Sequence, residues 1–236
     1  AFRRLADSGF KPRGTLTYLA VADEEALGTW GAKWLVENER DAVYADYVLT
    51  ESGGFQIPTP AGARLPVMVD EKGTYWSKLT VKGTPGHASQ PFRTDNAVVT
   101  AAEVVRRLHE YRPPTRIHDT WRGFVEGMEY PPEFRDALLK DDELRCFAGT
   151  LPLGLSRVVY SCTHTTFAPT VIHGGTKTNV IPDQVDIQVD IRTLPGETEE
   201  DVHHHLREAL GDLYPTVEIE GNDDPSTASV IRRSTD

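Results

Sequence analysis

The sequence predicts an α/β protein that begins with part of a parallel or mixed sheet and continues into an inserted α+β domain of the ferredoxin-like (βαββαβ) type. The first fifty residues follow a strand–helix–strand pattern with short loops, which is typical of a parallel βαβ unit. The second half places two helical patterns among four strand-like segments, one of which alternates strictly between apolar and polar residues.

The parallel part is predicted from two apolar segments that flank one helix. Residues 15–22 form a continuous apolar run typical of a buried strand, and residues 45–50 form the next one. Between them, residues 29–39 place two tryptophans at helical spacing. Three prolines in residues 56–66 then predict a loop or a domain boundary.

The inserted domain is predicted to begin with a strand over residues 75–81. The helix that follows is capped by Asp95 or Asn96 and carries apolar side chains along one face. Residues 111–160 contain two Pro-Pro pairs, so we expect an irregular insertion there. Residues 166–172 are expected to form the next strand.

The clearest periodicity of the chain lies in residues 185–192. Valine and isoleucine alternate there with aspartate, glutamine and arginine, so one face is buried and the other is hydrated. Thr198 and Asp201 resemble a capping box, which predicts a helix beginning at this point. A short closing strand is expected at residues 217–220.

Composition limits the possible partners. The 236 residues carry a formal charge of −11 without a basic stripe, which argues against a nucleic-acid partner. No apolar run approaches the ~20 residues that span a bilayer, so no membrane partner is expected. Cys146 and Cys162 make a poor disulfide framework and favour a reducing, cytoplasmic location. Because the chain starts without Met and ends abruptly, we expect a segment of a longer protein.

Acidic residues follow both apolar segments of the first part. Asp23, Glu24 and Glu25 end the first segment, Glu51 ends the second, and glycines follow each group. Burying several negative charges is costly unless cations compensate them. The pattern indicates a metal-dependent hydrolytic site at the edge of an open α/β sheet. The alternative is a solvated loop or first helical turn, stabilised by the helix dipole.

Four segments, in this order, resemble one family of enzymes. They are VADEE at 21–25, LTESGG at 49–54, GTPGHASQP at 83–91, and GGTKTNVIP at 174–182, the last continuing to DIR at 190–192. The family is that of the di-zinc exopeptidases and amidohydrolases, which includes aminoacylase, acetylornithine deacetylase, succinyl-diaminopimelate desuccinylase and glutamate carboxypeptidase. The resemblance covers most of the chain.

The resemblance implies a division into domains. Residues 1–70 would be a segment of the catalytic domain, and residues 71–220 would be a dimerisation or lid domain with an insertion at about 111–160. Residues 221–236 would return toward the catalytic domain. A homodimer joined through the lid domain is implied as well.

The resemblance also implies roles for the acidic residues. Glu24 would be the general base, Glu25 would bind one metal ion, and Glu51 would bind the other. The complete enzyme would hold two zinc ions, or cobalt or manganese in their place. These roles agree with the chemistry, because zinc binds carboxylate oxygens and lowers the pKa of bound water to about 7.

Three further residues receive roles from the resemblance. His87 would reach into the active site of the partner subunit and donate a hydrogen bond to the oxyanion, assisted by Asn179. Arg192 would bind a substrate carboxylate through its forked donors. The alternative for Arg192 is an ordinary ion pair with Asp190 or Asp186.

The implied activity is hydrolysis of an amide or peptide bond in a small acylated amino acid or peptide. The family also needs a His-x-Asp pair and a bridging Asp upstream, and another His downstream, and the 236 residues lack all of these. We therefore expect the chain alone to be incomplete for activity. The alternative is a catalytically incomplete dimerisation or binding module without the histidine ligands.

The run of His203, His204 and His205 invites a metal-binding interpretation. Three successive residues of a helix point in different directions and cannot chelate one ion together. We therefore expect a solvated helix face at this run.

Overall fold

The structure is a computed structural model that describes residues 2–26, 28–49 and 56–221. The chain forms two compact units, one over residues 1–51 and the other over residues 52–236. Each unit is described by itself.

The described part of the first unit is helical. The predicted helix over residues 29–39 is present, beginning as a π-helical turn and continuing as an α-helix. Its elements are α1 (Phe2–Asp7), the 3₁₀ turn η1 (Glu24–Ala26), the π turn η2 (Thr29–Lys33), α2 (Trp34–Asn38) and α3 (Arg40–Val43).

The two strands expected in the first unit are absent from its described residues, so this part of the prediction is wrong. Residues 15–22 and 45–49 have no strand partner within residues 2–26 and 28–49. Their apolar side chains are exposed, including Tyr18 and Leu49. A strand exists only as one member of a hydrogen-bonded pair, so an apolar run without a neighbouring strand stays extended coil.

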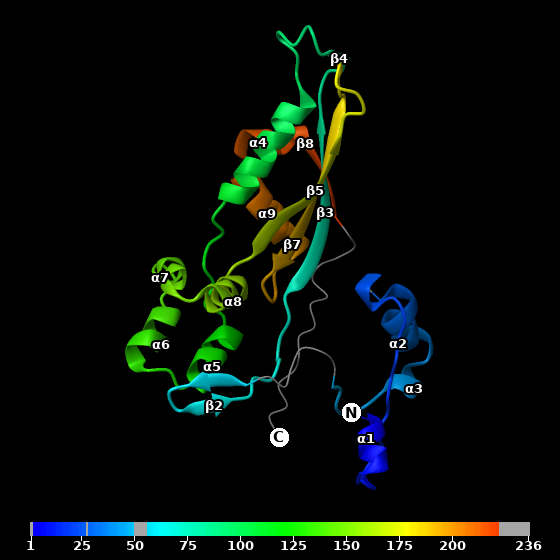
Figure 1. Ribbon diagram of the computed structural model, residues 1–236, viewed down its shortest axis with the longest axis vertical. Helices are drawn as coiled ribbons and strands as arrows, with labels where there is room; N and C mark the ends of the chain where they lie inside the picture. The colour runs from blue at the N-terminus through cyan, green and yellow to red at the C-terminus, as the bar shows by residue number, and fades with distance from the viewer. Residues whose placement is uncertain (1, 27, 50–55, 222–236) are drawn as a thin grey trace. The chain divides into compact units, whose positions relative to one another are not determined.

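The second unit is built on a four-stranded antiparallel sheet. Its order is β5 (Thr166–Gly174), β7 (Gln184–Thr193), β3 (Gly73–Lys82) and β8 (Val217–Gly221), as Figure 1 shows. The strands at 75–81, 166–172, 185–192 and 217–220 are therefore confirmed. The alternation in β7 is also confirmed, because its valines and isoleucines are buried.

Two helices cover one face of this sheet (Figure 1). Helix α4 (Ala97–Glu110) is capped by Asn96, whose side chain accepts a hydrogen bond from Val98 N. Helix α9 (Glu199–Leu210) begins with the predicted Thr198–Asp201 capping box, and the 3₁₀ turn η3 (Gly211–Thr216) leads from it into β8. The helices and the sheet share the main core, formed by Tyr75, Leu79, Val104, Leu108, Ile187, Ile191, Leu206 and Leu210 with their neighbours.

Most of the insertion is helical, which corrects the expectation of an irregular segment over residues 111–160; its first part, residues 111–118, is irregular as expected. Pro-Pro pairs predicted irregular chain, but Pro131 and Pro132 precede and occupy the first turn of a helix, where the missing N–H costs nothing. A separate core around Trp121, Leu138 and Leu144 holds the insertion together. Its helices are α5 (Asp119–Gly127), α6 (Pro132–Leu138), α7 (Leu144–Thr150) and α8 (Leu153–Thr163).

A buried polar junction joins the insertion to the sheet. His164 is fully buried and stacks on Tyr160, with ring centroids 4.2 Å apart. Its Nδ1 lies 3.1 Å from the Tyr160 carbonyl oxygen, which can only accept, so Nδ1 carries the proton. Its Nε2 then accepts from the Thr115 hydroxyl at 3.0 Å. Burial lowers the pKa of His164 to about 4.

The remaining elements of the second unit are two small antiparallel pairs. These are β1 (Ile57–Thr59) with β2 (Gly62–Arg64), and β4 (Gly86–His87) with β6 (Val180–Ile181). Within the described ranges, no helix has the length and apolar character needed to cross a membrane.

We predict that acidification destabilises the second unit through His164. The unfolded chain takes up this proton near pH 6.5, whereas the folded protein resists it down to about pH 4. Stability is therefore complete above pH 6.5 and falls as the pH drops toward 4. Between pH 7 and pH 5 the free energy of unfolding, measured with urea, should fall by about 2 kcal/mol from this group.

The variant His164→Asn is the control for this prediction. It is expected to be less stable at pH 7, because the stacked ring is lost, but its stability should change less between pH 7 and pH 5. An equal loss on acidification in both proteins would contradict the assignment.

Candidate functional site

The acidic turn of the first unit has a constrained backbone. Asp23 adopts a positive φ of 50°, and its carboxylate Oδ2 accepts a hydrogen bond from Trp30 N at 2.9 Å. Gly31 packs so closely that a Cβ there would lie 2.0 Å from the carbonyl oxygen of Ala22. The start of the helix therefore holds the turn in place, and only glycine fits at position 31.

This turn presents two adjacent carboxylates to solvent. Glu24 and Glu25 form the first residues of η1 and are exposed. Asp23 Oδ1 is buried and has no hydrogen-bond partner among the described residues. Glu51 lies outside the described residues, so its position relative to the turn stays a prediction.

The described residues of the turn include side chains of a type that binds metal ions, but too few of them to form a complete site. Carboxylate oxygens are suitable zinc ligands, and an orphaned carboxylate oxygen at Asp23 is a polar atom that a cation would satisfy. Catalytic zinc usually has about three protein ligands. Within residues 2–26, 28–49 and 56–221, no three His, Cys, Asp or Glu side chains converge in such a group. The two-zinc centre remains a prediction.

The structure brings His87 and Asn179 together at one end of the second unit. Strand β4, at one end of the second unit (Figure 1), pairs with β6. In this pairing His87 lies opposite Val180. Ala88 N donates to the carbonyl oxygen of Asn179 at 3.0 Å. Gly83 permits the close passage of this loop over α4, because a Cβ there would lie 2.6 Å from Ala97 N.

Hydrogen bonds fix which nitrogen of His87 carries the proton. The backbone N–H of Ser89 donates to Nδ1 at 3.2 Å, and the Ser89 hydroxyl lies 2.7 Å from the same atom. Nδ1 is thus an acceptor, which places the proton on Nε2 in the neutral ring. The exposed ring can therefore offer an N–H donor to a ligand, as an oxyanion-binding group must.

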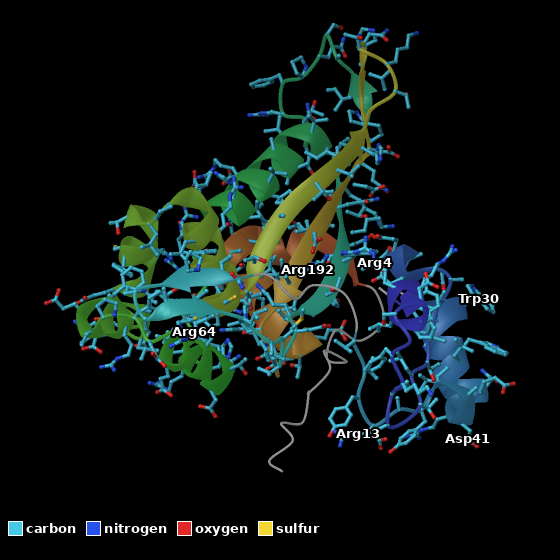
Figure 2. All side chains as sticks on the ribbon, turned by 60° about the horizontal axis from the view of Figure 1, so that its bottom comes forward. Arg4, Arg13, Trp30, Asp41, Arg64 and Arg192 are labelled. Atoms are coloured by element: carbon cyan, nitrogen blue, oxygen red, sulfur yellow. The ribbon has the colours of Figure 1, made fainter. Side chains whose placement is uncertain are left out.

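Arg192 lies at the opposite end of the sheet, on β7 (Figure 2). Its guanidinium donates to both carboxylate oxygens of Asp190, at 2.7 and 3.0 Å, and to the Thr74 hydroxyl at 2.7 Å. The ion pair that the sequence left open as an alternative is therefore formed. A pair this exposed contributes little stability, and a ligand carboxylate could compete for the same donors.

The length of the sheet separates these two groups. Thr74 pairs with Arg192, and Lys82 pairs with Gln184, eight residues further along β3. Eight strand residues span about 26 Å, and His87 lies beyond Lys82. His87 and Arg192 of one chain therefore cannot contact the same small molecule.

Lys72 is a functional candidate that sequence reasoning missed. Its ammonium donates to the His164 carbonyl oxygen at 2.8 Å and to Thr166 Oγ1 at 3.4 Å. Burial lowers its pKa to about 8. The sequence holds no signal for it, since a lysine after two acids is typical of an exposed turn.

His205 was also misjudged, because the histidine run is only partly solvated. His204 is exposed as expected, but His205 is 6% exposed and its Nδ1 lies 2.8 Å from the Tyr111 hydroxyl. The helix α9 turns this ring toward the core side. His203 has a different partner, because its Nδ1 lies 3.0 Å from the Tyr214 hydroxyl.

The chain thus combines an exposed acidic turn in one unit with an antiparallel α+β unit that carries His87 at one end. The chain belongs to the M20 peptidase family: residues 69–218 match its peptidase dimerisation domain. This match includes β3, β5, β7 and the start of β8, both covering helices and the helical insertion.

Similar proteins support the same placement. "Probable carboxypeptidase S-like 2" of Dictyostelium discoideum is 26% identical over 221 residues, covering 88% of this chain and 41% of the relative. "Probable succinyl-diaminopimelate desuccinylase" of Staphylococcus aureus is 27% identical over 222 residues, covering 92% and 48%. The M20 family metallo-carboxypeptidase Sso-CP2 from Sulfolobus solfataricus shares the fold at 17% identity, with a TM-score of 0.50 over 83% of this chain and 46% of that one. The chain thus spans less than half the length of these relatives.

We predict that neutral His87 carries its proton on Nε2. Two-dimensional ¹⁵N NMR of the imidazole nitrogens at pH 8 should show a protonated Nε2 and an unprotonated Nδ1. Ser89→Ala should keep this tautomer, because the backbone N–H remains. Ser89→Pro removes that donor and should shift the population toward Nδ1–H. A protonated Nδ1 in the unaltered protein would contradict the assignment.

Proposed function

We propose that this chain is the central part of a metal-dependent hydrolase that cleaves an amide or peptide bond of a small acylated amino acid or peptide. The observation that carries the proposal is the constrained turn that presents Glu24 and Glu25 side by side. Membership of the M20 peptidase family supports the reaction class. Because the relatives are about twice as long, the activity belongs to a longer protein that includes this chain.

In this proposal Glu24 and Glu25 have different roles: Glu25 binds metal and Glu24 transfers a proton. Glu25 holds one metal ion and Glu51 the other, with zinc as the expected metal and cobalt or manganese as substitutes. When bound, the ions supply an acidified water and stabilise negative charge. Glu24 accepts the proton of the attacking water and returns it to the leaving amine nitrogen.

The second unit supplies the groups that recognise the substrate. The Nε2–H of His87 donates to the developing oxyanion, and Asn179 lies beside it to assist. Arg192 binds a free carboxylate of the substrate by exchanging it for Asp190. The acyl group itself has no assigned pocket in this scheme.

A homodimer follows from the separation of these groups. Since about 26 Å of strand lies between His87 and Arg192, one substrate can meet both only if they come from two copies. An apolar surface is available for association near the His87 end, where α4 runs beside β5. Its exposed side chains are Val98 and Val99 on α4 and Ile172 on β5.

The rival proposal is a dimerisation or binding module without catalysis. The incomplete ligand set within the described residues favours it. We give the hydrolase preference because a constrained turn and an orphaned carboxylate oxygen have no evident use in a module that only associates. The cytoplasm is the proposed location, in keeping with two unpaired cysteines.

Metal binding separates the two proposals. We predict that the full-length protein binds two zinc ions in a calorimetric titration, and that Glu25→Ala and Glu51→Ala each weaken one of them at least tenfold. Glu24→Gln should leave zinc binding nearly unchanged while reducing kcat by at least a hundredfold. An intact full-length protein that binds no zinc would rule out the hydrolase.

Mixed dimers test whether His87 acts in the partner subunit. Glu24→Gln and His87→Ala homodimers should each be nearly inactive. After subunit exchange at equal amounts, half of the dimers are mixed and each has one intact site, so activity should return to about a quarter of the unaltered value. No recovery, despite exchange shown by a labelled subunit, would mean that His87 acts within its own chain.

A further inference from the structure

The second unit contains a cavity of about 600 Å³ outside the residues assigned above. It lies between helix α5 and an extended segment, residues 64–72, which we call the strap. The volume lies within the range of sites that bury small organic ligands, roughly 300–1,000 Å³.

Polar contacts hold the strap at both ends. At one end, Arg64 forms an ion pair with Glu129 at 2.5 Å, just beyond α5. Toward the other end, Asp70 accepts a hydrogen bond from the Thr120 hydroxyl at 3.0 Å, and Lys72 is bonded to His164. The strap therefore runs along α5 and is anchored on both sides of the cavity.

Apolar groups line the space between these anchors. The residues of α5 that face it recur at helical spacing from Thr120 to Gly127, so the cavity is elongated along the helix. Nothing lies within 4 Å of a Cβ placed on Gly127, so the helix leaves room there. The main apolar side chains are Val67, Met68, Trp121, Phe124, Val158 and Leu194.

A hydrogen-bond donor stands at one end of the cavity. The Lys72 ammonium has three N–H donors, and two of them go to His164 and Thr166 within the described residues. The neighbouring acid Asp70 is occupied by Thr120 and by the backbone of Glu71. At the far end, Arg64 is neutralised by Glu129. Among the described residues that line the cavity, Lys72 is thus the cation without an ion-pair partner, and it keeps one N–H for a ligand oxygen.

We propose that this cavity binds the straight hydrocarbon chain of a fatty-acyl ligand, with the carboxylate or carbonyl oxygen of its head at Lys72. An elongated apolar space, with a cation at one end that has no ion-pair partner among the described residues, matches an unbranched amphiphile. A compact aromatic or a highly charged ligand would leave part of the space empty or a charge unpaired. The binding is independent of the hydrolytic site proposed above.

Chain length tests the apolar part of this proposal. Calorimetric titration of the full 236-residue chain with octanoate, decanoate and dodecanoate, all below micelle formation, should give one site. Each added methylene should tighten binding by roughly fourfold, since burying a CH₂ is worth about 0.8 kcal/mol. Absence of saturable dodecanoate binding, or no dependence on chain length, would overturn the proposal.

Substitutions locate the site. Gly127→Leu places a side chain in the cavity and should weaken dodecanoate binding at least tenfold, and Val158→Phe should act in the same direction. Gly149→Leu is the matched control, because it is also an open helical glycine but does not line this cavity, and it should bind normally. Equal affinity of Gly127→Leu, or an equal loss in Gly149→Leu, would overturn the assignment.

Lys72→Met tests the head group. It should weaken dodecanoate binding about tenfold, as expected for a charge-assisted hydrogen bond, and should leave dodecanol binding nearly unchanged. Circular dichroism and urea unfolding of each variant exclude loss of folding as the cause. If the folded Lys72→Met variant binds dodecanoate as tightly as the unaltered chain, the head does not lie at Lys72.

Discussion

The arrangement of the second unit depends on one buried carboxylate, that of Glu197. It is 6% exposed and accepts hydrogen bonds from Leu194 N at 2.8 Å, from Arg116 at 3.2 Å and from the Thr165 hydroxyl. Burial alone would raise its pKa, but these donors and the nearby His205 outweigh burial and lower the pKa to about 2. The group is therefore ionised at neutral pH, and its loss would leave the buried Leu194 N–H and Thr165 hydroxyl without this acceptor.

This carboxylate connects parts of the chain that have separate cores. Arg116 precedes the first helix of the insertion, whereas Leu194 directly follows β7 of the sheet core. The adjoining residues His164 and Lys72 extend the same junction to the start of β3. The strap over α5 ends at this junction, which also borders the cavity through Lys72 and Leu194.

Local signals explain which elements the sequence could predict. Strand β7 alternates with period two, and the caps at Asn96 and Thr198 satisfy helix N–H groups within three residues. Local signals led to a wrong prediction for the insertion, because its Pro-Pro pairs resemble helix breaks although Pro132 begins a helix. The prediction of strands at 15–22 and 45–50 was wrong for another reason. A strand needs a partner, and a partner is not a local property.

In the candidate site, too, the local sequence identifies individual residues, whereas long-range strand pairing decides where they lie. The sequence could single out His87 and Asn179, but only the pairing of β4 with β6 places them side by side. It could also single out Arg192 while leaving its distance from His87 open, because distance along a sheet follows from register. With the register known, the sheet is too long for one copy to bring both groups to one substrate. If they act together, dimerisation therefore completes the site in addition to stabilising the subunit, and the length of β3 and β7 is what makes it necessary.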